Sequence, residues 1–458
     1  MEVVSIFLAV FALLVTVGAG YLLVKGQKPV IVLLLAGFVM VAVSTALQPG
    51  FGVLDKEDSS GSRWLDVIGM FENVAGSQLT SVGLIIMAAG GFSTYMNKIG
   101  ASRALVELVS APISRIKHKY VLLIITYLVG AALFMFIPSA AGLAILLTVL
   151  LVPVLTAAGI SPAASAAVIA TASAMPMGPA SGTSVLASKT VGLSPVVYFV
   201  QNQLIVAIPT IIAIAITHYF VQRHYDRRGL EHYKSTEAKG DDAAEAGPGW
   251  YAIFLVLPIA LLIIFSPLVN DSVELTTVAA FIAVWLLALI CEMIRSKSFK
   301  KAADASTALF TGMGKMFGGV VALIIAAQIF AEGLTSTGVI DLLVKGGEKL
   351  GAGMAIMTVV FTLIVGLVTF LTGSGVGAFS AFSNLVPDIA KGLGGSAPAL
   401  ITPMEFASGL FRSMSPVSGV VIAVAGGAGI HPMDVVRRTA IPMIVGAVVM
   451  TSASLILL

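Results

Sequence analysis

Charged residues are scarce in this chain. Of its 458 residues, 11% are charged and 58% are hydrophobic, whereas a soluble domain carries about 25% charged residues. So few charges cannot cover a protein surface against water, and the chain is therefore predicted to be an integral membrane protein. At about 20 residues per helical span, it has room for roughly ten to fourteen membrane segments.

Residues for metal, redox and covalent chemistry are also few. The single cysteine, Cys291, excludes an intramolecular disulfide and any multi-cysteine metal site. The five histidines lack the spacing of a metal-binding motif, and no nucleophile, base and orienting group occur together. The net charge is only +3, and its basic residues lie in a few loops, as in cytoplasmic membrane loops rather than nucleic-acid surfaces. We therefore expect no enzyme, no cofactor and no nucleic-acid partner.

Basic loops orient the predicted spans. Lys25 and Lys28 separate the first two apolar runs, and an acidic stretch over 48–79 follows the second. By the positive-inside rule, the first loop is cytoplasmic and the acidic stretch is periplasmic. Arg437 and Arg438 place the start of the last span inside, so both termini are predicted to be periplasmic. Other apolar runs predict spans over about 80–97, 195–220 and 316–331.

The two halves of the chain repeat each other. Leu-Val-Pro occurs at 151–153 and again at 385–387, and Pro179-Ala-Ser-Gly182 matches Pro416-Val-Ser-Gly419. All such matches lie within a few residues of one offset, 235, and the charge pattern gives the copies opposite topology. We divide the chain into a first repeat at 1–220, a cytoplasmic linker at 221–248 and a second repeat at 249–458. Within them, 1–119 and 249–350 are predicted scaffold helices.

The remaining parts of the repeats, 120–220 and 351–458, are broken by proline and glycine. Each is predicted to contain a re-entrant hairpin followed by a broken transmembrane helix; for 120–157, two full crossings are the alternative. The fold class is thus an all-α polytopic membrane protein of two inverted-topology repeats. This pattern is typical of secondary transporters, whose substrate site lies near the membrane midplane.

Small hydroxyl residues beside glycine mark four helix starts inside these regions. Helix N-termini expose N–H groups and partial positive charge, and therefore bind carboxylates; the alternative is helix packing through small residues. The predicted substrate-binding residues of this kind are Ser139, Gly142, Ser181, Gly182, Thr183, Thr372, Ser374, Gly375, Ser415, Ser418 and Gly419.

Two ionisable residues in the second broken region break the symmetry of the repeats. Arg412 lies three residues before Ser415, where its guanidinium fits a substrate carboxylate. The alternative is a structural ion pair with Glu405, which lies seven residues earlier. Glu405 is the best local candidate for carrying a coupling proton. His218 is assigned to the margin of the linker.

Several motifs resemble the anaerobic four-carbon dicarboxylate carriers of the DcuC family. They are Ser415-Pro-Val-Ser-Gly-Val-Val-Ile-Ala-Val-Ala-Gly426, Asp434-Val-Val-Arg-Arg-Thr439 and Thr372-Gly-Ser-Gly375. The resemblance implies transport of fumarate, succinate, malate or aspartate across a bacterial inner membrane, and places Arg412 at the arginine that precedes the family's Ser-Pro-Val-Ser-Gly motif. It also implies a homodimer of the ion-transporter superfamily that works by an elevator motion.

Two questions remain open at the level of sequence. Transport by exchange and transport coupled to H⁺ or Na⁺ both fit, since no cluster of carboxylates decides between them. The alternative functions are a carrier of another organic anion or an amino acid in the same superfamily, and an anion channel.

Overall fold

The computed structural model describes residues 2–113, 116, 118–228, 247–269, 273, 275–339 and 353–458. Throughout these ranges the regular structure is helical, and 10 helices are long and apolar enough to cross a membrane. The prediction of an all-helical polytopic membrane protein is therefore confirmed. Most of the linker predicted at 221–248 lies outside the described residues, as does the end of the second scaffold segment after residue 339.

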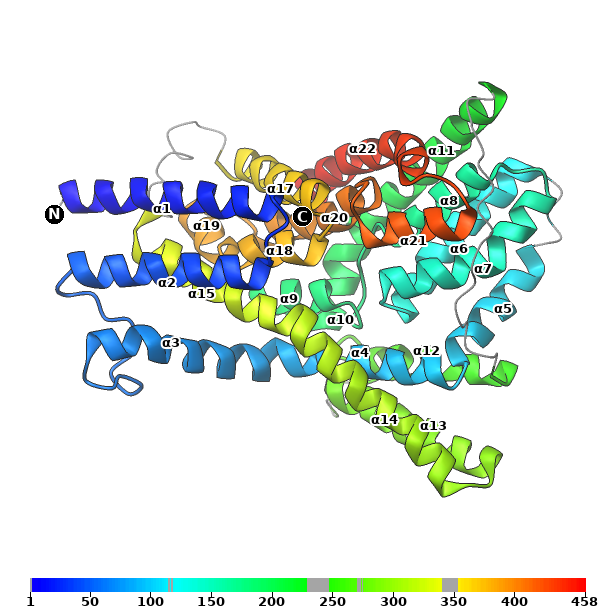
Figure 1. Cartoon of the computed structure of the whole chain (residues 1–458), viewed down its shortest axis with the longest axis horizontal. Coiled ribbons are helices and arrows are strands. Elements are labelled where there is room, and N and C mark those ends of the chain that lie inside the picture. The colour runs from blue at the N-terminus through cyan, green and yellow to red at the C-terminus, as the bar shows by residue number, and fades with distance from the viewer. Residues whose placement is uncertain are drawn as a thin grey trace.

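Helices follow one another along both halves of the chain (Figure 1). The helices of the first half are α1 (Glu2–Val24), α2 (Pro29–Leu47), α3 (Arg63–Gln78), α4 (Leu84–Lys98), α5 (Ala101–Ile113), α6 (Lys119–Phe136), α7 (Ala140–Ala157), α8 (Pro162–Thr171), α9 (Gly182–Thr190), α10 (Pro195–Tyr198) and α11 (Leu204–Arg228). Those of the second half are α12 (Ala252–Ile264), α13 (Thr277–Ser296), α14 (Phe299–Met316), α15 (Ala322–Ser336), α17 (Gly353–Thr372), α18 (Gly375–Ser383), α19 (Val386–Gly392), α20 (Ala397–Ser413), α21 (Gly419–Ala428) and α22 (Pro432–Leu457).

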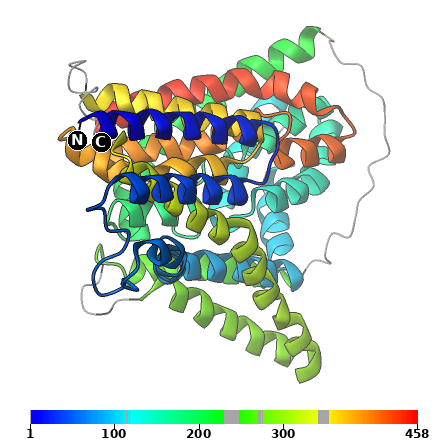
Figure 2. The same cartoon turned by 60° about the vertical axis from the view of Figure 1, so that its left-hand side comes forward.

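Two long spans each consist of two helices joined by a π-helical turn. A π-helical turn joins α3 to α4, and another joins α14 to α15, so that the spans run over 63–98 and 299–336. They cross where Gly91 meets Gly312, since a Cβ added to Gly312 would lie 2.8 Å from the Gly91 Cα. Small residues allow such close helix crossings in membranes. In both views the α13–α14 pair projects from one end of the bundle (Figures 1 and 2).

Both long spans begin earlier than hydropathy predicted. Apolar runs indicated spans over 80–97 and 316–331, but the helices begin at Arg63 and Phe299. The first turns of α3 are amphipathic, because only a stripe containing Val67, Met70 and Val74 is buried. A window of average hydropathy does not detect a helix of that kind.

Each half also contains a pair of helices joined by a tight turn. Helices α6 and α7 pack against each other, as do α17 and α18. Ser139 caps α7 by accepting a hydrogen bond from the N–H of Gly142, and Ser374 caps α18 by accepting one from the N–H of Gly377, each at 3.3 Å. The same capping geometry therefore recurs at the turns between the paired helices of both halves.

A broken helix follows each of these pairs. Helices α8 and α9 are separated by the non-helical residues 172–181, and α20 and α21 by residues 414–418; we call these stretches the first and second break. Helices α11 and α22 then pack side by side. Figure 2 shows both ends of the chain at the same edge of the view.

A buried ion pair joins α11 to α22. Nη1 of Arg438 lies 2.8 Å from Oδ1 of Asp226, and the Arg438 side chain is only 3% exposed. Asp226 also accepts a hydrogen bond from Ser161 at the start of α8, at 2.7 Å. Arg438, which indicated only a cytoplasmic loop in the sequence, therefore holds three helices together.

The assignment of His218 to the linker margin is wrong. Helix α11 continues as far as Arg228, and His218 is completely buried within it. The imidazole lies 2.9 Å from the hydroxyl of Thr171 and 3.1 Å from the amide of Gln222. The apolar run of the sequence ends before the helix does, because the last part of α11 is polar. This polar part is nevertheless buried, since it packs between α8 and α22.

Candidate functional site

The first break packs against α20 at a glycine. A Cβ added to Gly409 would overlap the carbonyl oxygen of Ala174 and lie 2.6 Å from Cδ of Pro176. Any larger residue at 409 would therefore push α20 away from the first break. At the turn before α18, Gly373 has φ of +71°, and a Cβ there would lie 2.8 Å from the carbonyl oxygen of Val417. The α17–α18 turn thus lies against the second break.

One face of α20 runs along the first break. Glu405, Gly409 and Arg412 are spaced four and three residues apart, so they share this face. Nη2 of Arg412 donates a hydrogen bond of 2.7 Å to the carbonyl oxygen of Ser173. Glu405 has other partners, and the Arg412–Glu405 ion pair considered from the sequence does not form between these two described side chains.

Three polar atoms, one at the end of α20 and one in each break, are buried without a hydrogen-bond partner among the described residues. They are Nε of Arg412, Oγ of Ser173 and Oγ of Ser418. Buried polar atoms in folded proteins nearly always have partners, so a group of unpaired ones calls for an explanation. All three atoms can donate, and a carboxylate only accepts. The arrangement is therefore suited to an anionic ligand.

Glu405 lies in a buried network that also reaches the first break. Its Oε2 accepts hydrogen bonds from the Tyr198 hydroxyl at 3.0 Å and from Nε2 of Gln203 at 2.9 Å. Oε1 of Gln203 in turn accepts from the N–H of Gly178 at 2.9 Å. Oε1 of Glu405 accepts no hydrogen bond from the described residues, and the Thr183 side chain lies close to this carboxylate; Oε1 is therefore able to take a proton or a cation.

A π-helical turn positions the two donors to Glu405. The turn spans Phe199–Gln203 between α10 and α11, and Tyr198 directly precedes it. Such turns are often found at functional sites because they change the direction in which side chains leave a helix. Here the turn directs Tyr198 and Gln203 to the same carboxylate.

The other predicted residues have different positions. Ser181 and Thr183 are buried at the end of the first break, with their hydroxyl oxygens 3.2 Å apart, and α9 packs against α20. Ser415 is held to α17, because its hydroxyl donates to the carbonyl oxygen of Phe370 at 2.6 Å. Thr372 donates to the carbonyl oxygen of Val368 at 2.7 Å.

The predicted helix starts differ in exposure. Ser139 is exposed at the α6–α7 turn, where it makes the capping bond to Gly142. Gly419 is exposed at the start of α21, and Gly182 is partly buried at the start of α9. Gly375 is buried, and a Cβ there would overlap the carbonyl oxygen of Ser408. This contact fits the packing alternative that the sequence left open beside substrate binding.

Sequence reasoning missed Ser173, Tyr198 and Gln203. A signal existed for the last two, since polar side chains interrupt an otherwise apolar run over 195–220. For Ser173 there was none, because serines are frequent in this region and nothing in the sequence pairs residue 173 with residue 412.

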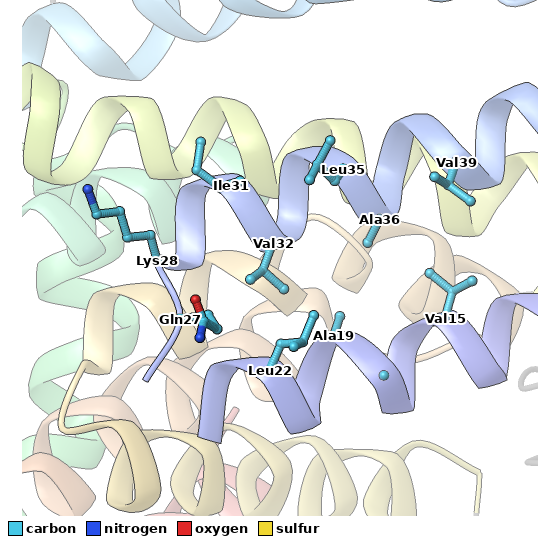
Figure 3. A pocket seen from close by; sticks show the side chains of 11 residues that line it. Val15, Ala19, Leu22, Gln27, Lys28, Ile31, Val32, Leu35, Ala36 and Val39 are labelled. Carbon is cyan, nitrogen blue, oxygen red and sulfur yellow. The ribbon is translucent and has the colours of Figure 1, made fainter. Parts of the chain in front are cut away.

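An apolar cavity lies elsewhere. It has a volume of about 580 Å³ between α1 and α2, and Figure 3 shows Ala19 and Leu22 facing Val32 and Ala36 across it. Its lining is apolar apart from Gln27 and Lys28, and none of it comes from α8, α9, α20 or α21. This cavity is not the candidate anion site.

Substitution of Gly409 tests the close approach of the first break to α20. The variant Gly409→Ala is expected to lower the stability of the protein by about 1–3 kcal/mol, since the added methyl group meets backbone atoms that have little room to move. Gly419→Ala is the matched control, because nothing lies within 4 Å of a Cβ there. Thermal unfolding of both variants in detergent measures the difference, and equal midpoints would contradict the packing described.

Comparison with known proteins gives one consistent family. A family model described as "DcuC: C4-dicarboxylate anaerobic carrier" matches residues 7–458. The probable anaerobic C4-dicarboxylate transporter DcuC of Vibrio cholerae is 34% identical over 463 residues, covering 100% of this chain and 99% of the relative. The anaerobic C4-dicarboxylate transporter DcuC of Escherichia coli K12 is 33% identical over 441 residues, covering 96% of this chain and 94% of the relative.

A solved structure shares the fold. The YdaH transporter of Alcanivorax borkumensis superimposes with a TM-score of 0.62 at 17% identity, covering 94% of this chain and 98% of that one. The similarity at this level of identity concerns the arrangement of helices alone.

Proposed function

Because this chain belongs to the DcuC family of C4-dicarboxylate anaerobic carriers, we propose that it is a secondary active transporter of four-carbon dicarboxylates such as fumarate, succinate, malate and aspartate. Its place is a bacterial inner membrane, which it crosses many times with both termini in the periplasm. The main support for the proposal is the set of unpaired buried donors on Arg412 of α20, Ser173 of the first break and Ser418 of the second break.

The substrate's two carboxylates are assigned to different parts of the site. One binds the guanidinium of Arg412 and the Ser418 hydroxyl at the second break, and Ser173 adds a third donor. Arg412 has five N–H donors, so its hydrogen bond to the Ser173 carbonyl leaves others for the substrate. The second carboxylate binds Ser181 and Thr183, whose buried hydroxyls adjoin each other; Ser139 completes this end when the α6–α7 turn closes on the substrate.

Uptake into vesicles tests this function. Purified protein in vesicles loaded with succinate is expected to take up labelled fumarate saturably, and unlabelled malate or aspartate is expected to compete. Competition by gluconate or citrate but not by succinate would instead indicate a carrier of another organic anion. Flux that rises linearly with concentration would indicate a channel.

We also propose that the two halves are inverted repeats and that transport uses an elevator motion in a homodimer. Support comes from the recurrence of a π-turn in each long span, of capped turns at Ser139 and Ser374, and of a break in each half. In this scheme α6–α9 and α17–α21 carry the substrate past the long spans α3–α4 and α14–α15.

Electrostatics constrains how the cycle is driven. Moving a dianion into a cell against about 100 mV costs about 4.6 kcal/mol. Exchange for an outgoing dianion cancels this cost, whereas net uptake requires co-transported cations. Glu405, buried with one unpaired oxygen, is the group we propose to carry a coupling proton; a bound Na⁺ at the same oxygen is the alternative.

The variant Glu405→Gln separates exchange from coupled uptake. Glutamine keeps an oxygen that accepts from Tyr198 and Gln203, but it carries no proton to release. Uptake driven by an inward proton gradient is expected to fall at least tenfold, while fumarate–succinate exchange changes less than threefold. Tyr198→Phe, which removes one donor and leaves the carboxylate, serves as the control. Undiminished gradient-driven uptake by Glu405→Gln would remove Glu405 from the coupling scheme.

A further inference from the structure

A basic cavity lies at the end of α11, outside the proposed substrate site. It has a volume of about 560 Å³ and is lined by Phe220, Val221, Arg223, His224, Tyr225, Arg227 and Ile441. In both views the end of α11 extends past the body of the protein (Figures 1 and 2). The last residue, Ile441, comes from α22, so helices from both halves contribute to the cavity.

The charge of this cavity is positive. Arg223 and Arg227 line it, and no carboxylate of the described residues does so. The nearest acid along α11, Asp226, is engaged with Arg438 and with Ser161. Arg223 stacks its guanidinium 5.9 Å from the ring of Tyr219, and its Nη1 donates a hydrogen bond of 3.4 Å to the Tyr219 hydroxyl, which leaves its other N–H donors available. A group with phosphate chemistry therefore finds two guanidinium groups here without a competing carboxylate in the lining.

Two exposed apolar stripes lead from the cavity into the membrane-spanning part of the protein. On α11, the stripe is formed by residues four apart that end at the cavity, and on α22 it begins at the cavity wall. These side chains are 47% to 63% exposed: Ile208, Ile212, Ile216 and Phe220 on α11, and Ile441, Ile444 and Val448 on α22. Because α11 and α22 pack side by side, the stripes form neighbouring apolar surfaces under one basic cavity.

Aromatic and basic residues mark this end of α11 as a membrane boundary. Tyr219 and Tyr225 flank the cavity together with Arg223 and Arg227, and such residues gather at the cytoplasmic interface of membrane helices. Basic pockets between transmembrane helices at this depth suit the head groups of anionic lipids. We propose that this cavity binds the phosphate of an anionic phospholipid, with the acyl chains lying on the stripes of α11 and α22. The proposal is independent of which substrate the protein carries.

Lipid competition followed by native mass spectrometry tests the proposal. The full-length protein in mild detergent is offered equal amounts of phosphatidylglycerol and phosphatidylethanolamine, and the retained lipid is counted. The wild type is expected to retain phosphatidylglycerol preferentially, and Arg223→Gln/Arg227→Gln is expected to reduce this preference roughly tenfold. The matched control is Lys300→Gln/Lys301→Gln, which removes the same charge from exposed lysines at the start of α14 and is expected to leave the preference unchanged.

Three outcomes would overturn the proposal. The first is that the wild type shows no preference for the anionic lipid. The second is that both double variants lose the preference equally, which would indicate a general charge effect. Alternatively, millimolar inorganic phosphate would displace the lipid head group completely, which would indicate a site for a free anion. If the double variant does not fold, the exposed single variant Arg227→Gln replaces it, with an expected loss of preference of about threefold to fivefold.

Discussion

Replacing Arg412 with alanine is expected to reduce the ratio of maximal rate to KM for fumarate uptake about 100-fold or more. The guanidinium supplies the only cationic group that the site residues contain, and its Nε is buried without a partner in the structure. Removing one member of a buried, hydrogen-bonded charge pair costs about 2–5 kcal/mol. Initial rates of labelled fumarate uptake into vesicles measure the loss.

Two further variants show whether that loss belongs to the carboxylate clamp. Arg412→Lys keeps the charge but not the planar pair of donors, so partial activity with a raised KM is expected. Arg437→Ala removes an arginine that is 66% exposed, and uptake is expected to be unchanged. Normal transport by Arg412→Ala would show that the substrate does not use this residue.

Replacing Asp226 with alanine is expected to lower the stability of the protein by about 3–5 kcal/mol. The change removes the carboxylate partner of Arg438, whose side chain is 3% exposed, and breaking a buried ion pair has a cost of this size; the contacts of Arg438 with Gln222 and Tyr225 remain. It also removes the acceptor for Ser161 at the start of α8. Thermal or denaturant unfolding in detergent measures the effect.

Asp434 provides the control for this prediction. Its carboxylate is 3.8 Å from Arg437, and both side chains of that pair are solvent-accessible, so Asp434→Ala is expected to change stability by less than about 1 kcal/mol. If Asp226→Ala and Asp434→Ala destabilised the protein equally, the buried ion pair would not be what holds α8, α11 and α22 together.

The order of helices was predictable because local sequence determines it. Long apolar runs predict spans, and proline and glycine near Ser139 and Ser374 predict where helices start again. The breaks are found where Pro179-Ala-Ser-Gly182 and Pro416-Val-Ser-Gly419 precede new helices. These features depend on backbone hydrogen bonding within a few residues, which a single sequence reveals.

The contacts across the site were not predictable in the same way. Gln203 meets Glu405 across 202 positions, and Arg412 meets Ser173 across 239. No periodicity or motif relates such distant residues, and the sequence offered Glu405 as a partner for Arg412 because only local spacing was visible. The burial of His218 was missed for a related reason, since a polar helix end becomes buried only when α8 and α22 pack against it.

In the proposed site, a dicarboxylate binds between the two breaks with one carboxylate on Arg412. A structure of the protein determined with bound succinate is the most direct measurement of this binding. A carboxylate is expected within hydrogen-bonding distance of the Arg412 guanidinium and of the Ser418 or Ser173 hydroxyl. Succinate bound elsewhere, with Arg412 bonded only to the Ser173 carbonyl and the buried donors still unpaired, would contradict it.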